Sequence, residues 1–132
     1  MKTKSLPPLS QDPFEIPIQN QLFMAACQTE VIYQTDDFVF TKCVDCSRMG
    51  LMYKQAMISF DLLNFDAFSR YLNRMEFHHE KFLFFDGMDR VVIETYHPDV
   101  QFTLLEEEFY QLKANIIEVN AQLQLIEMIR KM

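Results

Sequence analysis

Two segments of the chain repeat one pattern, and this repeat constrains the fold more than any other feature of the sequence. Residues 58–63 read Ile-Ser-Phe-Asp-Leu-Leu and precede Phe68, whereas residues 100–105 read Val-Gln-Phe-Thr-Leu-Leu and precede Phe109. Each segment follows another strand-like stretch and a short turn, and each leads into residues with helical spacing. The repeat therefore predicts two successive strand-strand-helix units.

The other elements follow from periodicity and turn residues. Alternation and β-branched or aromatic content predict strands at residues 31–33, 38–43, 49–53, 56–60, 82–85, 90–96 and 100–104. Apolar residues at helical spacing predict one helix over about 65–75 and a long one from 106 to 132. Each helix has an apolar stripe to bury. We therefore expect an α+β fold with an antiparallel sheet of about four to six strands and two helices on one face.

The domain organisation follows from length and proline content. A chain of 132 residues fits one domain, which we place at residues 21–132, with its two units at about 38–75 and 82–132. Four of the five prolines lie in residues 1–20, which predicts an extended leader. A free leader is favoured over one that packs on the domain through its few apolar residues.

The net charge and the length of the apolar segments limit where the protein can be located and which partners it can bind. Pro7 and Pro8 interrupt the region where a signal peptide needs its apolar core, and no run is long enough to span a bilayer. Three cysteines do not suggest a secreted disulfide framework, so we expect a cytoplasmic protein. The net charge of −7 argues against nucleic acid and anionic membranes as partners.

Cys43 and Cys46 form the one motif with recognisable chemistry. Two thiolates at this spacing can bind one Zn²⁺, but a structural site needs four ligands. Cys27 is the better candidate for a third ligand, because its strand is expected beside residues 38–43; the remaining candidates are the histidines at positions 78, 79 and 97. A dithiol redox role would favour a helix directly after the pair, and a strand is predicted there instead. Inert, reduced turn residues are the favoured interpretation.

No other group of residues forms a credible catalytic set. With only two glycines, the chain lacks a glycine-rich phosphate loop, and no serine lies in a nucleophile-elbow sequence. The acidic pair at 36–37 and the acidic run at 106–108 are explained by a turn and by a helix N-terminus. We therefore expect a protein that is not an enzyme and has no cofactor, with zinc as the alternative.

The long helix predicted at the end of this sequence carries more apolar residues than one small sheet can cover. One heptad-like stripe contains Phe109, Leu112, Ile116, Val119, Leu123 and Ile126. Further apolar residues lie off that stripe, namely Ile117, Leu125, Met128, Ile129 and Met132. They would pack against the first helix or the leader, or they would bind a protein partner or a second copy of the chain.

The order of these features resembles a small family of uncharacterised proteins from Bacteroidota, in which a Cys-x-x-Cys turn precedes two strand-strand-helix units. The matching positions fall within about residues 30–120; they are Cys43, Cys46, Met49, Leu51, Tyr53, Ile58, Phe60, Phe68, residues 90–93, Phe102, Leu104 and Leu112. At residues 53–55 the resemblance leads us to expect something closer to Phe-Gly-Asn than the Tyr-Lys-Gln found here. It implies a bacterial source and supports the fold, and it implies no established activity.

The sequence thus predicts a cytoplasmic, non-catalytic interaction or accessory domain that forms a homodimer through its C-terminal helix. The alternative is a small zinc- or thiol-dependent protein that works through Cys43 and Cys46.

Overall fold

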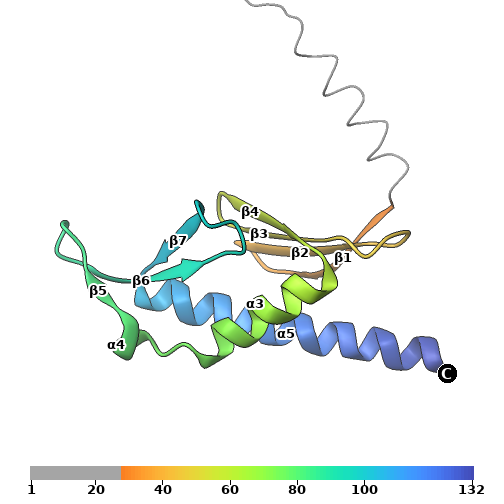
Figure 1. The fold of residues 1–132 in the computed structure, drawn as a ribbon. Helices are drawn as coiled ribbons and strands as arrows, with labels where there is room; N and C mark the ends of the chain where they lie inside the picture. The colour runs from red at the N-terminus through yellow and green to blue at the C-terminus, as the bar shows by residue number, and fades with distance from the viewer. Residues whose placement is uncertain (1–27) are drawn as a thin grey trace, which may run out of the picture.

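The fold is described by a computed structural model for residues 28–132, so the leader at 1–20 and the segment 21–27 lie outside the described residues. Figure 1 shows the arrangement. In chain order the elements are β1 (Thr29–Gln34), β2 (Phe38–Cys43), β3 (Met49–Tyr53), β4 (Ala56–Phe60), α3 (Leu62–Arg74), α4 (Phe77–Glu80), β5 (Phe82–Leu83), β6 (Asp89–Glu94), β7 (Gln101–Leu104) and α5 (Glu106–Lys131).

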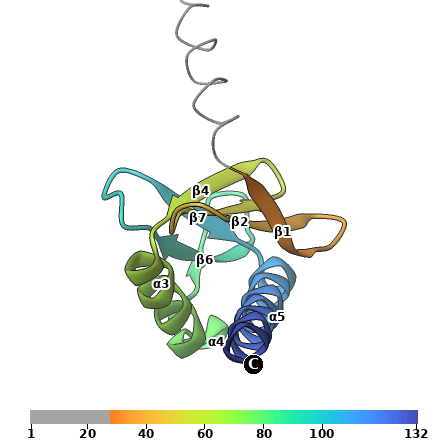
Figure 2. The same cartoon turned by 90° about the vertical axis from the view of Figure 1, so that its right-hand side faces the viewer.

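The strands form two antiparallel meanders. One sheet has the order β1-β2-β3-β4 and the other the order β5-β6-β7, with antiparallel pairing between all neighbours. Helices α3 and α5 lie side by side beneath both sheets (Figure 2). The expected α+β class, with antiparallel strands, two helices on one face and a long C-terminal helix, is confirmed. The difference from the expectation is that the strands divide between two sheets.

A side chain, rather than a ladder of backbone hydrogen bonds, joins the two sheets between β4 and the β6–β7 loop. The hydroxyl of Tyr96, in that loop, donates to the carbonyl of Ser59 at 2.6 Å, and its ring lies 6.1 Å from that of Phe60. On the helix side, the hydroxyl of Tyr71 accepts the N–H of Glu94 at 3.0 Å. These contacts hold the sheets together without merging them.

The hairpin turns follow from local sequence. Gly87 has a φ of +81° in the turn after β5, where the Asp-Gly pair predicts one. The two-residue turn at Lys54 and Gln55 is also confirmed, with Lys54 in the left-handed region at a φ of 55°. That is the position where the resemblance leads us to expect glycine, so the turn keeps its conformation at the cost of placing a Cβ there.

Helix boundaries depend on caps. The side chain of Asp61 accepts the N–H of Asn64 at 2.8 Å, so α3 begins at Leu62, three residues before the predicted start. The Glu108 carboxylate accepts the N–H of Leu105 at 2.9 Å and closes the start of α5, which has the expected length. Within residues 28–132, no helix combines the length and the apolar character needed to cross a membrane.

Two predicted segments differ from the structure. Residues 76–81, for which the sequence predicts neither a helix nor a strand, contain the short helix α4, because Phe77 is buried and holds this turn against the core. The strand expected at 82–85 pairs only at Phe82 and Leu83, since the N–H of Phe84 is already used inside the turn, where it donates to the carbonyl of Met88.

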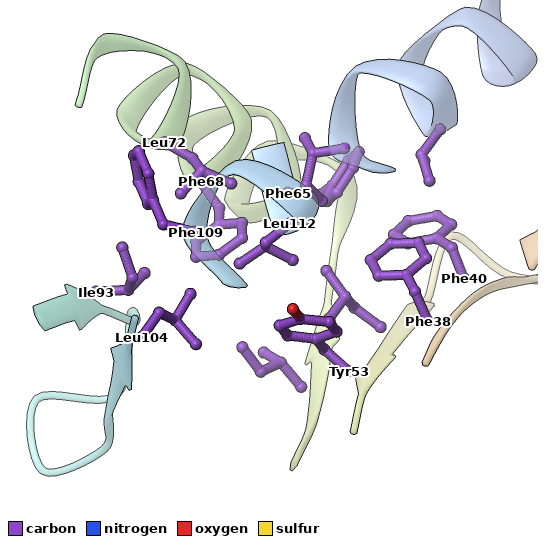
Figure 3. Packing of buried hydrophobic residues seen from close by; sticks show 14 of the residues in the cluster. Phe38, Phe40, Tyr53, Phe65, Phe68, Leu72, Ile93, Leu104, Phe109 and Leu112 are labelled. Carbon is purple, nitrogen blue, oxygen red and sulfur yellow. The ribbon is translucent and has the colours of Figure 1, made fainter. Parts of the chain in front are cut away.

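The core lies between the strands and the helices (Figure 3). Alternate residues of β2, β3, β4 and β6 point into it, so that the side chains on that face are buried while their neighbours are more exposed. Among residues 28–132, twenty apolar side chains are buried, and the largest fully buried ones include Phe38, Phe40, Phe60, Phe65, Phe77 and Phe109. Aromatic residues therefore fill most of the space between the layers.

The strand-strand-helix order occurs twice, as β3-β4-α3 and β6-β7-α5. The residues that look alike in sequence do not occupy equivalent places. Phe60 is the last residue of β4 and is fully buried, whereas Phe102 lies inside β7 and is only partly buried. The units thus repeat in topology, and a repeat at the level of sequence stays a prediction.

Candidate functional site

The two cysteines of the Cys-x-x-Cys motif lie at the β2–β3 loop in different environments. Cys43 ends β2, its side chain is buried, and its backbone N–H donates to the carbonyl of Arg48 at 2.9 Å. Cys46 lies in the loop itself and is exposed. The loop therefore presents one thiol to solvent and holds the other against the core.

The start of β1 lies beside this loop. Thr29 pairs with Cys43, and the carbonyl of Gln28 accepts the N–H of Val44 at 2.7 Å. The prediction of Cys27 as the third zinc ligand depends on the β1–β2 hairpin, and this hairpin is present. Cys27 itself lies outside the described residues, so its position relative to the loop stays a prediction.

The histidines belong to the other half of the domain. His78 Nε2 lies 2.9 Å from Glu106 Oε2, and the His97 ring lies 4.2 Å from the Tyr96 ring. His79 is exposed on α4. In the part of the chain from residue 28 onward, no three His, Cys, Asp or Glu side chains gather closely enough to hold a metal ion.

A shallow groove of about 270 Å³ separates the cysteine loop from the C-terminal half of α5. Val44, Cys46 and Met49 line one side of it, and Leu123 and Ile126 line the other. The last two are the final members of the predicted apolar stripe and are only partly buried. At this point the stripe is no longer fully buried in the core, and its side chains face the cysteine loop.

The first part of the same stripe is buried. Phe109, Leu112, Ile116 and Val119 are at most 3% exposed, as the heptad-like spacing predicts. Polar contacts hold α5 against α3 beside them, because the Asn120 amide donates to Ser69 Oγ at 3.3 Å. One face of α5 therefore completes the core.

The opposite face of α5 carries a second apolar stripe that runs most of the length of the helix. With 3.6 residues per turn, its members lie roughly opposite the buried stripe. They are Tyr110, Ala114, Ile117, Ala121, Leu125 and Met128, and all six are exposed. Ile117, Leu125 and Met128 are 56%, 50% and 64% exposed, and the neighbouring Ile129 is 60% exposed. We refer to the six residues from Tyr110 to Met128, without Ile129, as the outward stripe.

The sequence predicted only part of this surface. The large residues were recognised because they lie off the buried stripe, whereas Ala114 and Ala121 were missed because alanine is unremarkable in a helix. The signal that finds them is spacing: positions 110, 114, 117, 121, 125 and 128 continue one three- and four-residue rhythm. The apolar surplus of α5 is therefore an ordered stripe.

The first and last turns of α5 carry opposite charges. Residues 106–108 are all glutamate in the first turn, and Arg130 and Lys131 lie in the last turn. Both sets complement the helix macrodipole. Glu106 also faces His78, and Glu108 lies 3.5 Å from Lys54. The outward stripe is thus bounded by an acidic end and a basic end.

A tyrosine hydroxyl fixes α5 to the first sheet. Tyr53, at the end of β3, donates to Gln111 Oε1 at 2.6 Å, and its oxygen lies 3.2 Å from the carbonyl of Glu108. Its side chain is 4% exposed. Burial, helped by the negative charge of Glu108, raises the pKa of Tyr53 to about 12. Sequence patterns do not predict this contact, because Tyr53 and Gln111 are 58 positions apart in the chain.

A second exposed apolar surface lies at the β5–β6 hairpin, which projects at one end of the molecule (Figure 1). Phe82, Leu83 and Phe85 are 60%, 73% and 102% exposed. Arg90 pairs with Asp86 across the hairpin at 2.7 Å, and the pKa of Asp86 is lowered by that hydrogen bond. The hairpin is therefore locally braced although its apolar side chains contact little.

Comparison with models of protein families identifies the family of the chain. A family model described as a family of unknown function, DUF6686, matches residues 24–130. The chain belongs to this family. The match to DUF6686 covers both strand-strand-helix units and the cysteine loop, and it confirms the expected resemblance to an uncharacterised family. A source in Bacteroidota and a Cys-x-x-Cys motif shared by the family stay predictions. Comparison with curated proteins and with solved structures found no match.

Proposed function

We propose that this member of DUF6686 is a non-catalytic interaction domain that associates with a second copy of itself through the C-terminal helix. The observation that carries the proposal is the outward stripe of α5. It stands opposite the buried stripe, so the helix can complete the core and bind a partner at once. Exposed apolar side chains arranged in one continuous row are typical of helix-in-groove and helix–helix association.

Two further features support this function over an enzymatic one. The titratable side chains that the sequence suggested for chemistry are divided, since Cys43 and Cys46 lie at the β2–β3 loop and His78 lies on α4 beside Glu106. Methionine at position 128 adds an adaptable side chain to the exposed row. We place the protein in the cytoplasm on the sequence grounds given above.

The interaction is tested by placing a charge in the outward stripe. We expect the wild-type chain to form a concentration-dependent dimer in sedimentation velocity. Leu125→Glu should raise the dissociation constant at least about ten-fold, because a carboxylate would be buried in an apolar contact. Circular dichroism and thermal melting should be nearly unchanged, since Leu125 is half exposed and lies outside the core.

Leu63→Glu is the matched control. Leu63 is also a helical leucine and is 81% exposed, but it lies on α3. This variant should dimerise like the wild-type chain. A wild-type chain that stays monomeric at all concentrations, or equal effects of the two substitutions, would contradict the proposal.

A zinc- or thiol-dependent role for Cys43 and Cys46 is the second candidate. It is favoured by one observation: the backbone of Gln28 is held beside Val44, which brings the residue after Cys27 to the cysteine loop. Cys27, Cys43 and Cys46 would then supply three thiolates to one Zn²⁺.

Metal analysis of protein purified without chelators tests the zinc candidate. The zinc candidate predicts close to one zinc per chain, which Cys46→Ser should lose and which Ser47→Ala in the same loop should keep. A chelator should then destabilise the wild-type fold. Zinc-free protein whose unfolding is insensitive to chelators would exclude this role.

A further inference from the structure

We propose that two copies of the chain pair their α5 helices antiparallel, about a two-fold axis at the height of Val119. This inference rests on the self-association proposed above and specifies its geometry. The outward stripe is long enough for such a contact, because Tyr110 and Met128 are separated by about 27 Å along the helix at 1.5 Å per residue.

The order of side-chain sizes along the outward stripe favours the antiparallel direction. From Tyr110 the stripe reads large, small, large, small, large, large, with Ala114 and Ala121 as the small members. When the second helix runs in the opposite direction about position 119, Ile117 of one copy faces Ala121 of the other. By the same geometry, Ala114 lies within one residue of the level of Leu125, which is on the same face.

Each small residue then meets a large one, which is how side chains of two packed helices fill the space between them. Tyr110 and Met128 face each other at both ends of the contact, where a sulfur atom and an aromatic ring pack favourably. A parallel pair would instead place Ala114 on its own copy and Ala121 on its own copy, and the gaps would lie beside Ile117 and Leu125.

The charges of the helix ends favour the same direction. An antiparallel pair sets the acidic first turn of one helix, where Glu106 and Glu107 flank the outward stripe, beside Lys131 of the other. A parallel pair sets glutamates against glutamates and basic residues against basic residues. Each copy has a net charge of −7, so a dimer needs local attraction of this kind to offset general repulsion.

Photo-cross-linking tests the direction of the pair in the full chain. Benzoylphenylalanine is introduced in place of Met128, and unlabelled and ¹⁵N-labelled chains are mixed so that intermolecular products are identified by mass spectrometry. The antiparallel pair predicts cross-links to residues near Tyr110 and Ala114 of the second copy. Intermolecular cross-links to residues around Leu125 would indicate a parallel pair and overturn the inference.

The failure of this inference is distinguishable from the failure of the proposed function. A dimer that cross-links elsewhere retains self-association and loses the antiparallel geometry, whereas a chain that never dimerises loses both.

A second variant gives an independent measure of the direction of the pair. Lys131→Glu should weaken the dimer about five-fold at low salt, with a smaller effect at high salt, because it replaces attraction to the acidic turn with repulsion. An unchanged dissociation constant at low salt would contradict the charge arrangement.

Discussion

Phe65→Ala is expected to lower the free energy of unfolding by about 3–5 kcal/mol. Phe65 is 1% exposed on α3, and its ring centroid lies 4.7 Å from that of Phe40 and 5.6 Å from that of Phe60. Removal of the ring takes away packing between the first sheet and α3 and leaves a cavity that rigid aromatic neighbours fill poorly. Urea denaturation followed by circular dichroism gives the change directly.

The matched control for this prediction is Phe85→Ala. Phe85 is fully exposed at the β5–β6 hairpin, so the same chemical change should alter the unfolding free energy by less than about 0.5 kcal/mol. If Phe65→Ala cost less than about 1 kcal/mol, the ring would not be packed as described.

Stability is expected to fall by about 2–3 kcal/mol between about pH 10 and pH 12 because of Tyr53. In the folded chain, burial and the nearby carboxylate of Glu108 hold the pKa of Tyr53 at about 12, whereas the unfolded chain ionises this phenol at its usual value near 10. The unfolded state therefore loses its proton first. The stabilisation is complete below about pH 10 and is lost as pH rises through the folded pKa.

Tyr53→Phe isolates this effect from the other groups that titrate in alkali. At neutral pH the variant should be less stable by about 1 kcal/mol, because the hydroxyl no longer donates to Gln111. The wild-type chain should lose stability faster than the variant above about pH 10, so the two urea midpoints should converge or cross. Parallel loss of stability in both proteins would contradict the raised pKa.

Elements set by local sequence were predicted well. The turn at Gly87 and the buried stripe from Phe109 to Val119 each depend on residues close together in the chain, whereas the cap at Asp61 places the start of α3 three residues before the predicted one. The predicted strand at residues 82–85 was too long because apolar composition does not report whether a partner strand is available. Helix α4 was missed because a single buried residue, Phe77, carries no periodicity.

Features that depend on distant segments could not be read from one sequence. The hydrogen bond from Tyr53 to Gln111 joins residues 58 positions apart, and the hydrogen bond from Tyr96 to Ser59, which joins the two sheets, spans 37 positions. Of the candidate sites, the exposed surplus on α5 was foreseen from periodicity. The different exposure of Cys43 and Cys46 was not, because their shared motif is the same in either environment.

Helix α5 contacts β1 in the first sheet and both β6 and β7 in the second, so it packs against both halves of the core. The first sheet therefore needs a helix from the second half of the chain to cover its inner face. In the order of synthesis, both sheets leave the ribosome before α5 does, and each exposes apolar side chains until α5 arrives. The domain therefore completes its core in one late step, and an early chain is most open to chaperones and to misassociation along those uncovered faces.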